Sequence, residues 1–227
     1  MTMRHRGALA AMAAGAAALT VATVVACGSG PAENVGADEV TALAGATGTP
    51  APSATASAAG AGTSSVPISE GTLPAGGATV PPARLVIPAI DVTATVKPVG
   101  VNARTNEFEV PPSVDVIGWY RYGPGLEADA GSVVIAGHVD SADQGKGAFF
   151  RLRELDRGDT LTATGTDGKP RAYRVVAREE YVKSKIPLDK YFARDGKPRL
   201  TLITCGGPFD PATRHYRDNI VVTAVPA

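Results

Sequence analysis

One thiol in this sequence could act as a nucleophile, and few side chains are available to assist it. The 227-residue chain contains two cysteines, Cys27 and Cys205, and three histidines. Cys27 closes an N-terminal apolar segment, whereas Cys205 follows a strand-like run near the other end of the chain. Catalysis by a thiol also requires an acid/base group and a donor for the oxyanion that develops on the attacked carbonyl. Outside the N-terminal segment, only His138 and His215 could be that acid/base group.

Cys205 closes the run Thr-Leu-Ile-Thr-Cys at residues 201–205, and Gly-Gly-Pro follows it. A strand that ends at Gly-Gly-Pro places its last side chain at the rim of a sheet, so we expect a partly exposed thiol. A reactive cysteine also needs positive charge nearby. Arg214 and Arg217, a short distance along the chain, are the candidates. The alternative is a buried structural cysteine, because cysteine packs like a small apolar residue.

His138 follows the apolar run 133–137 and precedes a loop of Gly, Ser and Asp at 140–147. Catalytic groups are often carried by loops that a rigid sheet holds in place. We therefore expect His138 to be the acid/base partner of Cys205. His215 lies between Arg214 and Arg217 in a polar loop and is interpreted as a solvated loop residue.

The elements that must hold these residues are mostly short strands. Runs rich in β-formers, separated by Gly, Pro, Asn and Asp, predict a mainly β domain, either a barrel or a sandwich. Residues 148–155 and 187–193 are candidates for short helices. The predicted strands are residues 85–87, 93–101, 116–120, 132–139, 160–164, 171–177, 200–205 and 219–225.

The N-terminal third has the composition of an anchor and a tether. A positive start and an uncharged apolar stretch predict that residues 1–27 form an export signal or membrane anchor. The segment ends in Val-Val-Ala-Cys, which resembles a bacterial lipobox with Cys27 as the lipidated residue; an uncleaved helix is the alternative. Residues 28–79 are rich in Ala, Gly, Ser, Thr and Pro, and we expect a flexible linker there. Residues 80–227 form the predicted catalytic domain.

Composition excludes several classes of function. The formal net charge is zero, and basic and acidic residues are interspersed. Nucleic-acid binding is therefore not expected, because it requires a basic face. Two widely separated cysteines do not make a metal cage, and no Gly-rich phosphate loop is present. We expect no metal and no cofactor.

These motifs together resemble the sortase family of cysteine transpeptidases. Residues 201–205 are similar to its Thr-Leu-x-Thr-Cys signature, and Ala-Gly-His at 136–138 is similar to its histidine segment. Arg217, just before the apolar run 220–222, matches the arginine that opens the last strand of the family. The resemblance extends over residues 80–227, and Thr-Cys-Gly-Gly-Pro-Phe-Asp is most similar to actinobacterial class F or class E sortases.

The resemblance implies a closed, mostly antiparallel β-barrel of about eight strands with short helices. It implies that Cys205 is the nucleophile, His138 the acid/base and Arg217 the oxyanion or substrate clamp, with Thr204 contacting substrate. The substrates would be secreted proteins with a C-terminal Leu-Pro-x-Thr-Gly sorting signal, and the acceptor an amine of peptidoglycan or a pilin. The enzyme would work on the outer face of the cytoplasmic membrane, held there by its N-terminal helix or by a lipid on Cys27.

Two other functions stay open. A sortase-like barrel could bind a wall peptide without reacting with it. A cell-wall L,D-transpeptidase also uses Cys, His and Arg on a β-rich fold, but that family places His-Gly directly before its cysteine. Here Ile203 and Thr204 precede Cys205.

Overall fold

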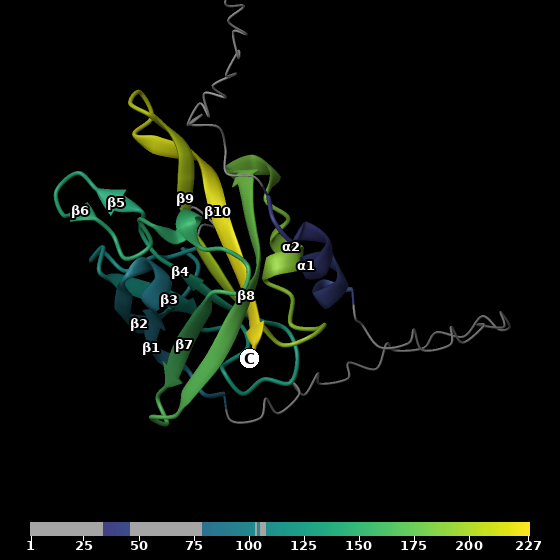
Figure 1. Ribbon diagram of the computed structural model, residues 1–227. Coiled ribbons are helices and arrows are strands. Elements are labelled where there is room, and N and C mark those ends of the chain that lie inside the picture. Colours follow the sequence, from purple (N-terminus) through teal and green to yellow (C-terminus); the bar gives the residue numbers. More distant parts are fainter. Residues whose placement is uncertain (1–33, 46–78, 103, 105–107) are drawn as a thin grey trace, which may run out of the picture. The chain divides into compact units, whose positions relative to one another are not determined.

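The computed structural model describes residues 34–45, 79–102, 104 and 108–227, and its main feature is an eight-stranded barrel (Figure 1). Around the closed barrel the strands follow the order β1-β2-β3-β4-β9-β10-β8-β7. The prediction of a mainly β, closed barrel of about eight strands with short helices is confirmed. The strands are β1 (Pro82–Ile87), β2 (Val92–Val99), β3 (Val116–Tyr120), β4 (Ser132–Ala136), β7 (Thr160–Gly165), β8 (Pro170–Val182), β9 (Arg199–Asp210) and β10 (His215–Pro226).

Neighbouring strands are antiparallel except for the pairs β2–β3 and β4–β9. A small ribbon, β5 (Asp140–Ser141) with β6 (Gly145–Lys146), follows β4 outside the barrel. The helices are short: α1 (Ala37–Ala44), η1 (Pro88–Ile90), η2 (Leu152–Glu154), η3 (Lys183–Lys185) and α2 (Leu188–Tyr191). The helix predicted at 148–155 is reduced to the single 3₁₀ turn η2, whereas the one predicted at 187–193 is present as α2.

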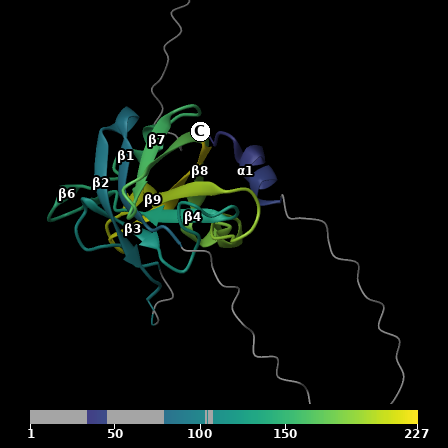
Figure 2. The same ribbon diagram turned by 90° about the horizontal axis from the view of Figure 1, so that it is seen from below.

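Alternating side chains fill the barrel. On β9, Leu200 and Leu202 are fully buried in the core, so Ile203 and Cys205 belong to the outer face. The view along the barrel in Figure 2 shows the strands surrounding this core. Apolar side chains from every strand of the barrel contribute to it, and among the largest are Leu85, Ile87, Ile117, Ile135, Phe149, Leu152, Leu155 and Leu161.

The predicted end of a strand at Cys205 is wrong. β9 continues to Asp210 and forms a hairpin with β10 that extends past the rest of the barrel (Figure 1). Gly207 and Pro208 face a single residue of β10, since Phe209 pairs with Tyr216 and Gly206 pairs with Asp218. This bulge accommodates a proline, which has no N–H for the ladder, and a glycine with φ of +70°.

The expected flexible linker at 28–79 contains a folded segment at 34–45. β7 pairs with β8 only as far as Arg174, and Val35 pairs with the edge of β8 beyond that point, at Arg178. Helix α1 then buries Val40 and Leu43 against the barrel. The sequence contains only this one apolar pair at helical spacing, too little to stabilise a helix that is not packed against other structure.

Residues 1–33 and 46–78 lie outside the described residues, and with them the predicted anchor, Cys27 and most of the predicted linker. Within the described ranges, no helix has the length and apolar character needed to span a membrane.

Candidate active site

Two parallel strands bring Cys205 and His138 together. On β4 and β9, Ala136 lies opposite Ile203. His138 is two residues beyond Ala136 and Cys205 two residues beyond Ile203, so each follows the last pair of the β4–β9 ladder by the same number of residues. Side chains alternate along a strand, so both belong to the outer face of the barrel. Cys205 is a free, half-buried thiol.

The backbone that carries His138 is held tightly although β4 has already ended. Gly137 N donates to Ile203 O over 3.1 Å, and the hydroxyl of Thr204 donates to Gly137 O over 2.8 Å. A Cβ at Gly137 would lie 2.7 Å from a methyl carbon of Ile117, so only glycine fits there. Thr204 is 5% exposed, and its hydroxyl is used inside the protein. Its contact with substrate stays a prediction.

His138 also contacts the loop between β2 and β3. Its Nε2 lies 3.0 Å from the carbonyl oxygen of Pro111. A carbonyl oxygen only accepts, so Nε2 must carry the proton in this hydrogen bond. The same loop is fixed to the one after His138, because Gln144 Nε2 donates to Pro112 O over 3.0 Å and Gln144 Oε1 accepts from Val114 N over 3.2 Å.

Arg217 occupies the bulge between β9 and β10. Cys205 pairs with Asn219, so Arg217 is two residues from the nucleophile's partner and on the same face by alternation. Its Nε and one Nη each donate to Asp218 over 2.9 Å, and this carboxylate raises the pKa of the guanidinium. Asp218 is 3% exposed and lies against Gly207, where a Cβ would be 2.1 Å from a carboxylate oxygen.

Two residues near Cys205 were not identified from the sequence. Tyr216 donates its hydroxyl proton to Asp140 over 2.5 Å, joining the hairpin to the loop after His138. That hydrogen bond, then burial and the negative charges of Asp140 and Cys205, raise the pKa of Tyr216 to about 12. Arg153 acts in the opposite direction on the same phenol, and its guanidinium approaches Gly206, the residue after Cys205. Nothing in their local sequence distinguishes them from surface residues.

The other sequence candidates lie on the hairpin. Arg214 is exposed at its turn with φ of +58°, and His215 is exposed at the start of β10. His215 is therefore a surface residue, as predicted. Arg214 lies on the far side of the bulge from Cys205, whereas Arg217 lies within the bulge and Arg153 approaches Gly206.

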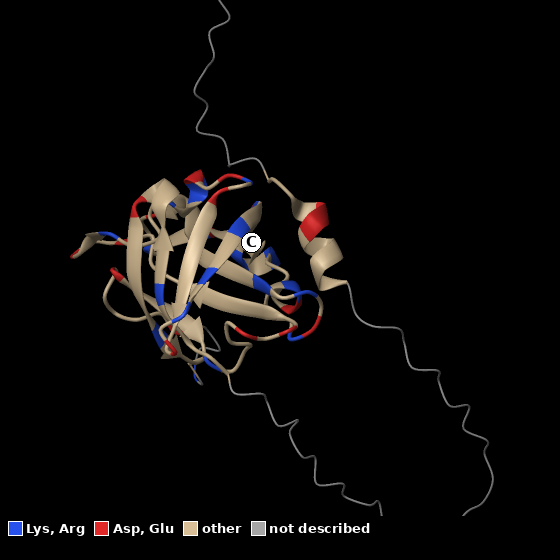
Figure 3. Cartoon of the chain, turned by 60° about the horizontal axis from the view of Figure 1, so that its bottom comes forward, with Lys and Arg blue, Asp and Glu red and all other residues tan. Residues whose placement is uncertain are grey.

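Charge and metal chemistry show no competing site. Basic and acidic residues alternate along the strands and loops of the barrel in the view of Figure 3, without a run of one sign. In the described part of the chain, no group of three or more His, Cys, Asp and Glu side chains could hold a metal ion.

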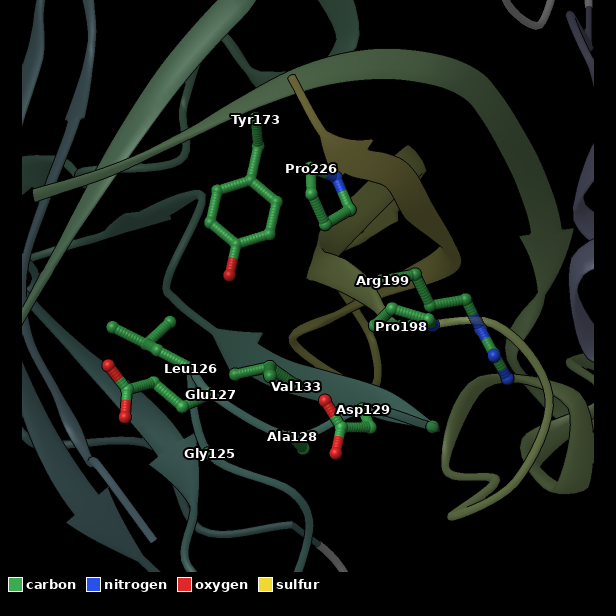
Figure 4. A pocket seen from close by; sticks show the side chains of 11 residues that line it. Gly125, Leu126, Glu127, Ala128, Asp129, Val133, Tyr173, Pro198, Arg199 and Pro226 are labelled. Atoms are coloured by element: carbon green, nitrogen blue, oxygen red, sulfur yellow. The ribbon is translucent and has the colours of Figure 1, made fainter.

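Two cavities of the barrel lie elsewhere. One, of about 280 Å³, is at the opposite end and is lined by Tyr173, Arg199 and Pro226 among others (Figure 4). The other, of about 330 Å³, lies beside η1 and residues 146–151. Neither is lined by Cys205, His138 or Arg217.

Comparison with known proteins agrees with these motifs. The family model for the sortase domain matches residues 85–227. A lid mutant of sortase A from Corynebacterium diphtheriae is 23% identical, with 64% of this chain and 69% of that chain covered and a TM-score of 0.49. Sortase C-1 from Actinomyces oris is 22% identical, with 63% and 73% covered and a TM-score of 0.48. No curated protein matches the chain. The match of the sortase model over more than half of the sequence shows that the chain belongs to the sortase family.

Proposed function

We propose that this sortase is a transpeptidase in which Cys205, His138 and Arg217 carry the reaction. The observation that supports this most directly is the register of three strands. Ala136 pairs with Ile203 on parallel β4 and β9, and His138 and Cys205 each follow this pair by two residues. Arg217 is two residues from Asn219, which pairs with Cys205. Reacting groups held on rigid strands need little reorganisation before they react.

The reaction has two covalent steps. The Cys205 thiolate attacks a peptide carbonyl carbon, and the C=O electron pair moves onto the oxygen. When the C=O bond reforms, the C–N bond breaks, and protonated His138 gives its proton to the departing amine. An incoming amine, deprotonated by neutral His138, then attacks the thioester and expels the thiolate. Since Nε2 donates to Pro111 O, Nδ1 is the nitrogen that exchanges the proton.

Arg217 stabilises the oxyanion formed in each step. Asp218 uses Nε and one Nη, which leaves the outer side of the guanidinium to donate to substrate. A donor that meets charge only in the transition state lowers the barrier instead of merely tightening binding. Tyr216 and Asp140 hold the hairpin and the histidine loop at a fixed separation.

The resemblance to sortases supports a proposal for the substrate and the location. We infer a Leu-Pro-x-Thr-Gly signal cut between Thr and Gly, and an envelope amine, of peptidoglycan or a pilin, as acceptor. We also infer attachment to the outer face of the cytoplasmic membrane through residues 1–27, by a helix or a lipid on Cys27. Thr-Cys-Gly-Gly-Pro-Phe-Asp at residues 204–210 supports class F, with class E next.

Incubation of the full chain with a fluorogenic Leu-Pro-x-Thr-Gly peptide and a glycine oligomer tests this proposal. We expect the mass of the enzyme to increase by the acyl fragment, and a new peptide joined to the glycine oligomer to form. Cys205→Ala should give neither product. If the native thiol reacts with iodoacetamide but with no peptide of a broad panel, the barrel binds wall peptides without turning them over.

A further inference from the structure

A single apolar cluster connects the N-terminal segment to the strands of the site. Val40 of α1, fully buried, packs in one cluster with Tyr191 of α2 and Val221 of β10. Ile203, two residues before Cys205, packs against the same cluster. The cluster covers the outer face of the barrel, on which Cys205 lies. Residues 34–45 are therefore in contact, through one packed layer, with the surface next to the nucleophile.

The segment holds the connection between β8 and β9, residues 183–198, at a second point. Lys197 N donates to Leu43 O over 2.9 Å. Gly196 has φ of +74°, and a Cβ there would lie 2.4 Å from Leu43 O, so the contact requires glycine. Val40 thus contacts the connection at α2, and Leu43 contacts it near its C-terminal end, at Gly196 and Lys197.

The other end of the segment is attached to β8 itself. Val35 and Arg178 exchange backbone hydrogen bonds of 2.8 and 2.9 Å, and Glu180 N donates to the Asn34 side chain over 2.7 Å. Arg157 adds an ion pair with Glu39 at 2.6 Å. These contacts attach the segment to β8 and to the turn before β7. They fix its position on the barrel, and the segment in turn holds the connection.

Beneath α2 lies a buried carboxylate that fixes the position of the helix. Glu179 is 2% exposed and accepts from the hydroxyls of Tyr191 and Tyr181, each over 2.6 Å. Burial, followed by the hydrogen bonds of Tyr191 to Glu179 and to Tyr181, raises the pKa of Tyr191. Val40 packs in the same cluster as this tyrosine. The apolar cover excludes water from the hydrogen bonds and so strengthens them.

We propose that residues 34–45 are a brace that holds the 183–198 connection in the position that binds the sorting peptide beside Cys205. This inference depends on the proposed transpeptidase function. At Phe192 the connection packs on the outer face of the barrel: the ring meets Tyr120 of β3 at 5.3 Å and packs against the same cluster as Ile203. Tyr120 belongs to the outer face that carries Cys205, by the alternation of β3 and its register with β4. The sortase match begins at residue 85, so the brace is an addition to the common domain.

The experiment compares Val40→Asp with Ala42→Asp in the full chain. Both place a carboxylate on α1, but Ala42 is exposed. We expect Val40→Asp to raise KM for the sorting peptide by about fivefold or more, as for other couplings between sites. kcat and the rate of alkylation of Cys205 by iodoacetamide should stay near the native values, and Ala42→Asp should match the native enzyme. Val40→Ala, which leaves no buried charge, should give a smaller increase in KM.

A second readout does not depend on turnover. Hydrogen exchange of the amides of residues 183–198 should accelerate in Val40→Asp and not in Ala42→Asp. Accelerated exchange without any peptide turnover in the native enzyme would support the brace and reject the proposed function. Unchanged exchange and KM would reject the brace. A lower KM in Val40→Asp would also reject it, because the segment would then be a cover that competes with the peptide.

Discussion

The two ends of the barrel contain tyrosines in opposite situations. At one end, Tyr216 is half exposed and donates to Asp140 near the thiol, and that bond is the main cause of its raised pKa. At the other end, burial alone raises the pKa of Tyr173, which is 4% exposed and has no hydrogen-bond partner among the described residues. Figure 4 shows its hydroxyl directed into the cavity. A perturbed group indicates function only where other reactive groups converge on it.

The two ends also differ in the side chains that they bring together. The cavity beside Tyr173 is lined by apolar residues such as Leu126 and Val133 and by the charged residues Glu127, Asp129 and Arg199, and no thiol is among its lining residues. The face around Cys205 has a thiol, an imidazole and a guanidinium within three adjoining strands. If this comparison is right, substitutions at the Cys205 end change the rate and those at the Tyr173 end do not.

The largest effect is expected for Cys205→Ala. It removes the only thiol of the described residues, so turnover should fall by about four orders of magnitude or more, as when other covalent nucleophiles are removed. The half-buried sulfur contributes little packing, and the melting temperature should stay close to the native value. Peptide cleavage and calorimetry on the same preparation test both statements. Residual turnover above a few percent would remove Cys205 from the mechanism.

The second largest effect is expected for Arg217→Ala. It should lower kcat by about 10²- to 10³-fold, the usual result of deleting one oxyanion donor. Arg214→Ala is the matched control, because this arginine is exposed at the hairpin turn. It should retain nearly native kcat in the same assay. Equal losses would show that the positive charge of the hairpin matters and not the position of Arg217.

The fold and the positions of the site residues could be predicted from the sequence to different degrees. The strand pattern was enough to predict a mainly β domain, a barrel or a sandwich, because period-two alternation is a local property. The closed barrel came from the resemblance to sortases, and the residue types made Cys205 and His138 candidates. Their alignment depends on the parallel pairing of β4 with β9, which are separated by more than 60 residues, and no local pattern encodes it.

Other features of the structure depend on contacts between residues that are distant in the sequence, so the sequence did not predict them. Gly207 and Pro208 suggest the end of a strand, and only pairing with Asp218 turns them into a bulge. Residues 34–45 have the composition of a linker, and they fold because Val35 pairs with the open edge of β8 and Val40 packs in one cluster with Tyr191. Tyr216 and Arg153 lack any distinctive spacing, so only the fold shows that they are near the thiol.

Asp218→Asn tests the carboxylate that holds Arg217 while the arginine itself stays in place. Asparagine has nearly the same shape, but loses the charge that holds the guanidinium fork. We expect kcat to fall by about tenfold, or ~1.4 kcal/mol in the barrier, with little change in KM. Arg217→Ala combined with Asp218→Asn should be no slower than Arg217→Ala alone. Independent, multiplying losses would contradict a role through Arg217.

Tyr216→Phe should lower kcat only a few-fold, because it frees the hairpin from the histidine loop without removing a reacting group. Its pH dependence is more specific. The phenol must be protonated to donate to Asp140, so its contribution to stability is complete below the ordinary pKa of about 10. That contribution is lost as the pH rises through the folded value of about 12. Urea unfolding should therefore separate native protein from variant at about pH 9, and the difference should vanish above about pH 12.

The smallest effect is expected at the far end, for Tyr173→Phe. The hydroxyl is directed into the cavity and no hydrogen bond joins it to another described residue, so removing it should leave the free energy of unfolding within about 1 kcal/mol of the native value. kcat and KM should remain native, since Tyr173 and Cys205 lie at opposite ends of strands that pair through β10. Denaturant titration and peptide kinetics on one sample provide both numbers. A clear loss of activity at full stability would mean that the cavity communicates with the thiol, and the two ends of the barrel could no longer be treated as independent.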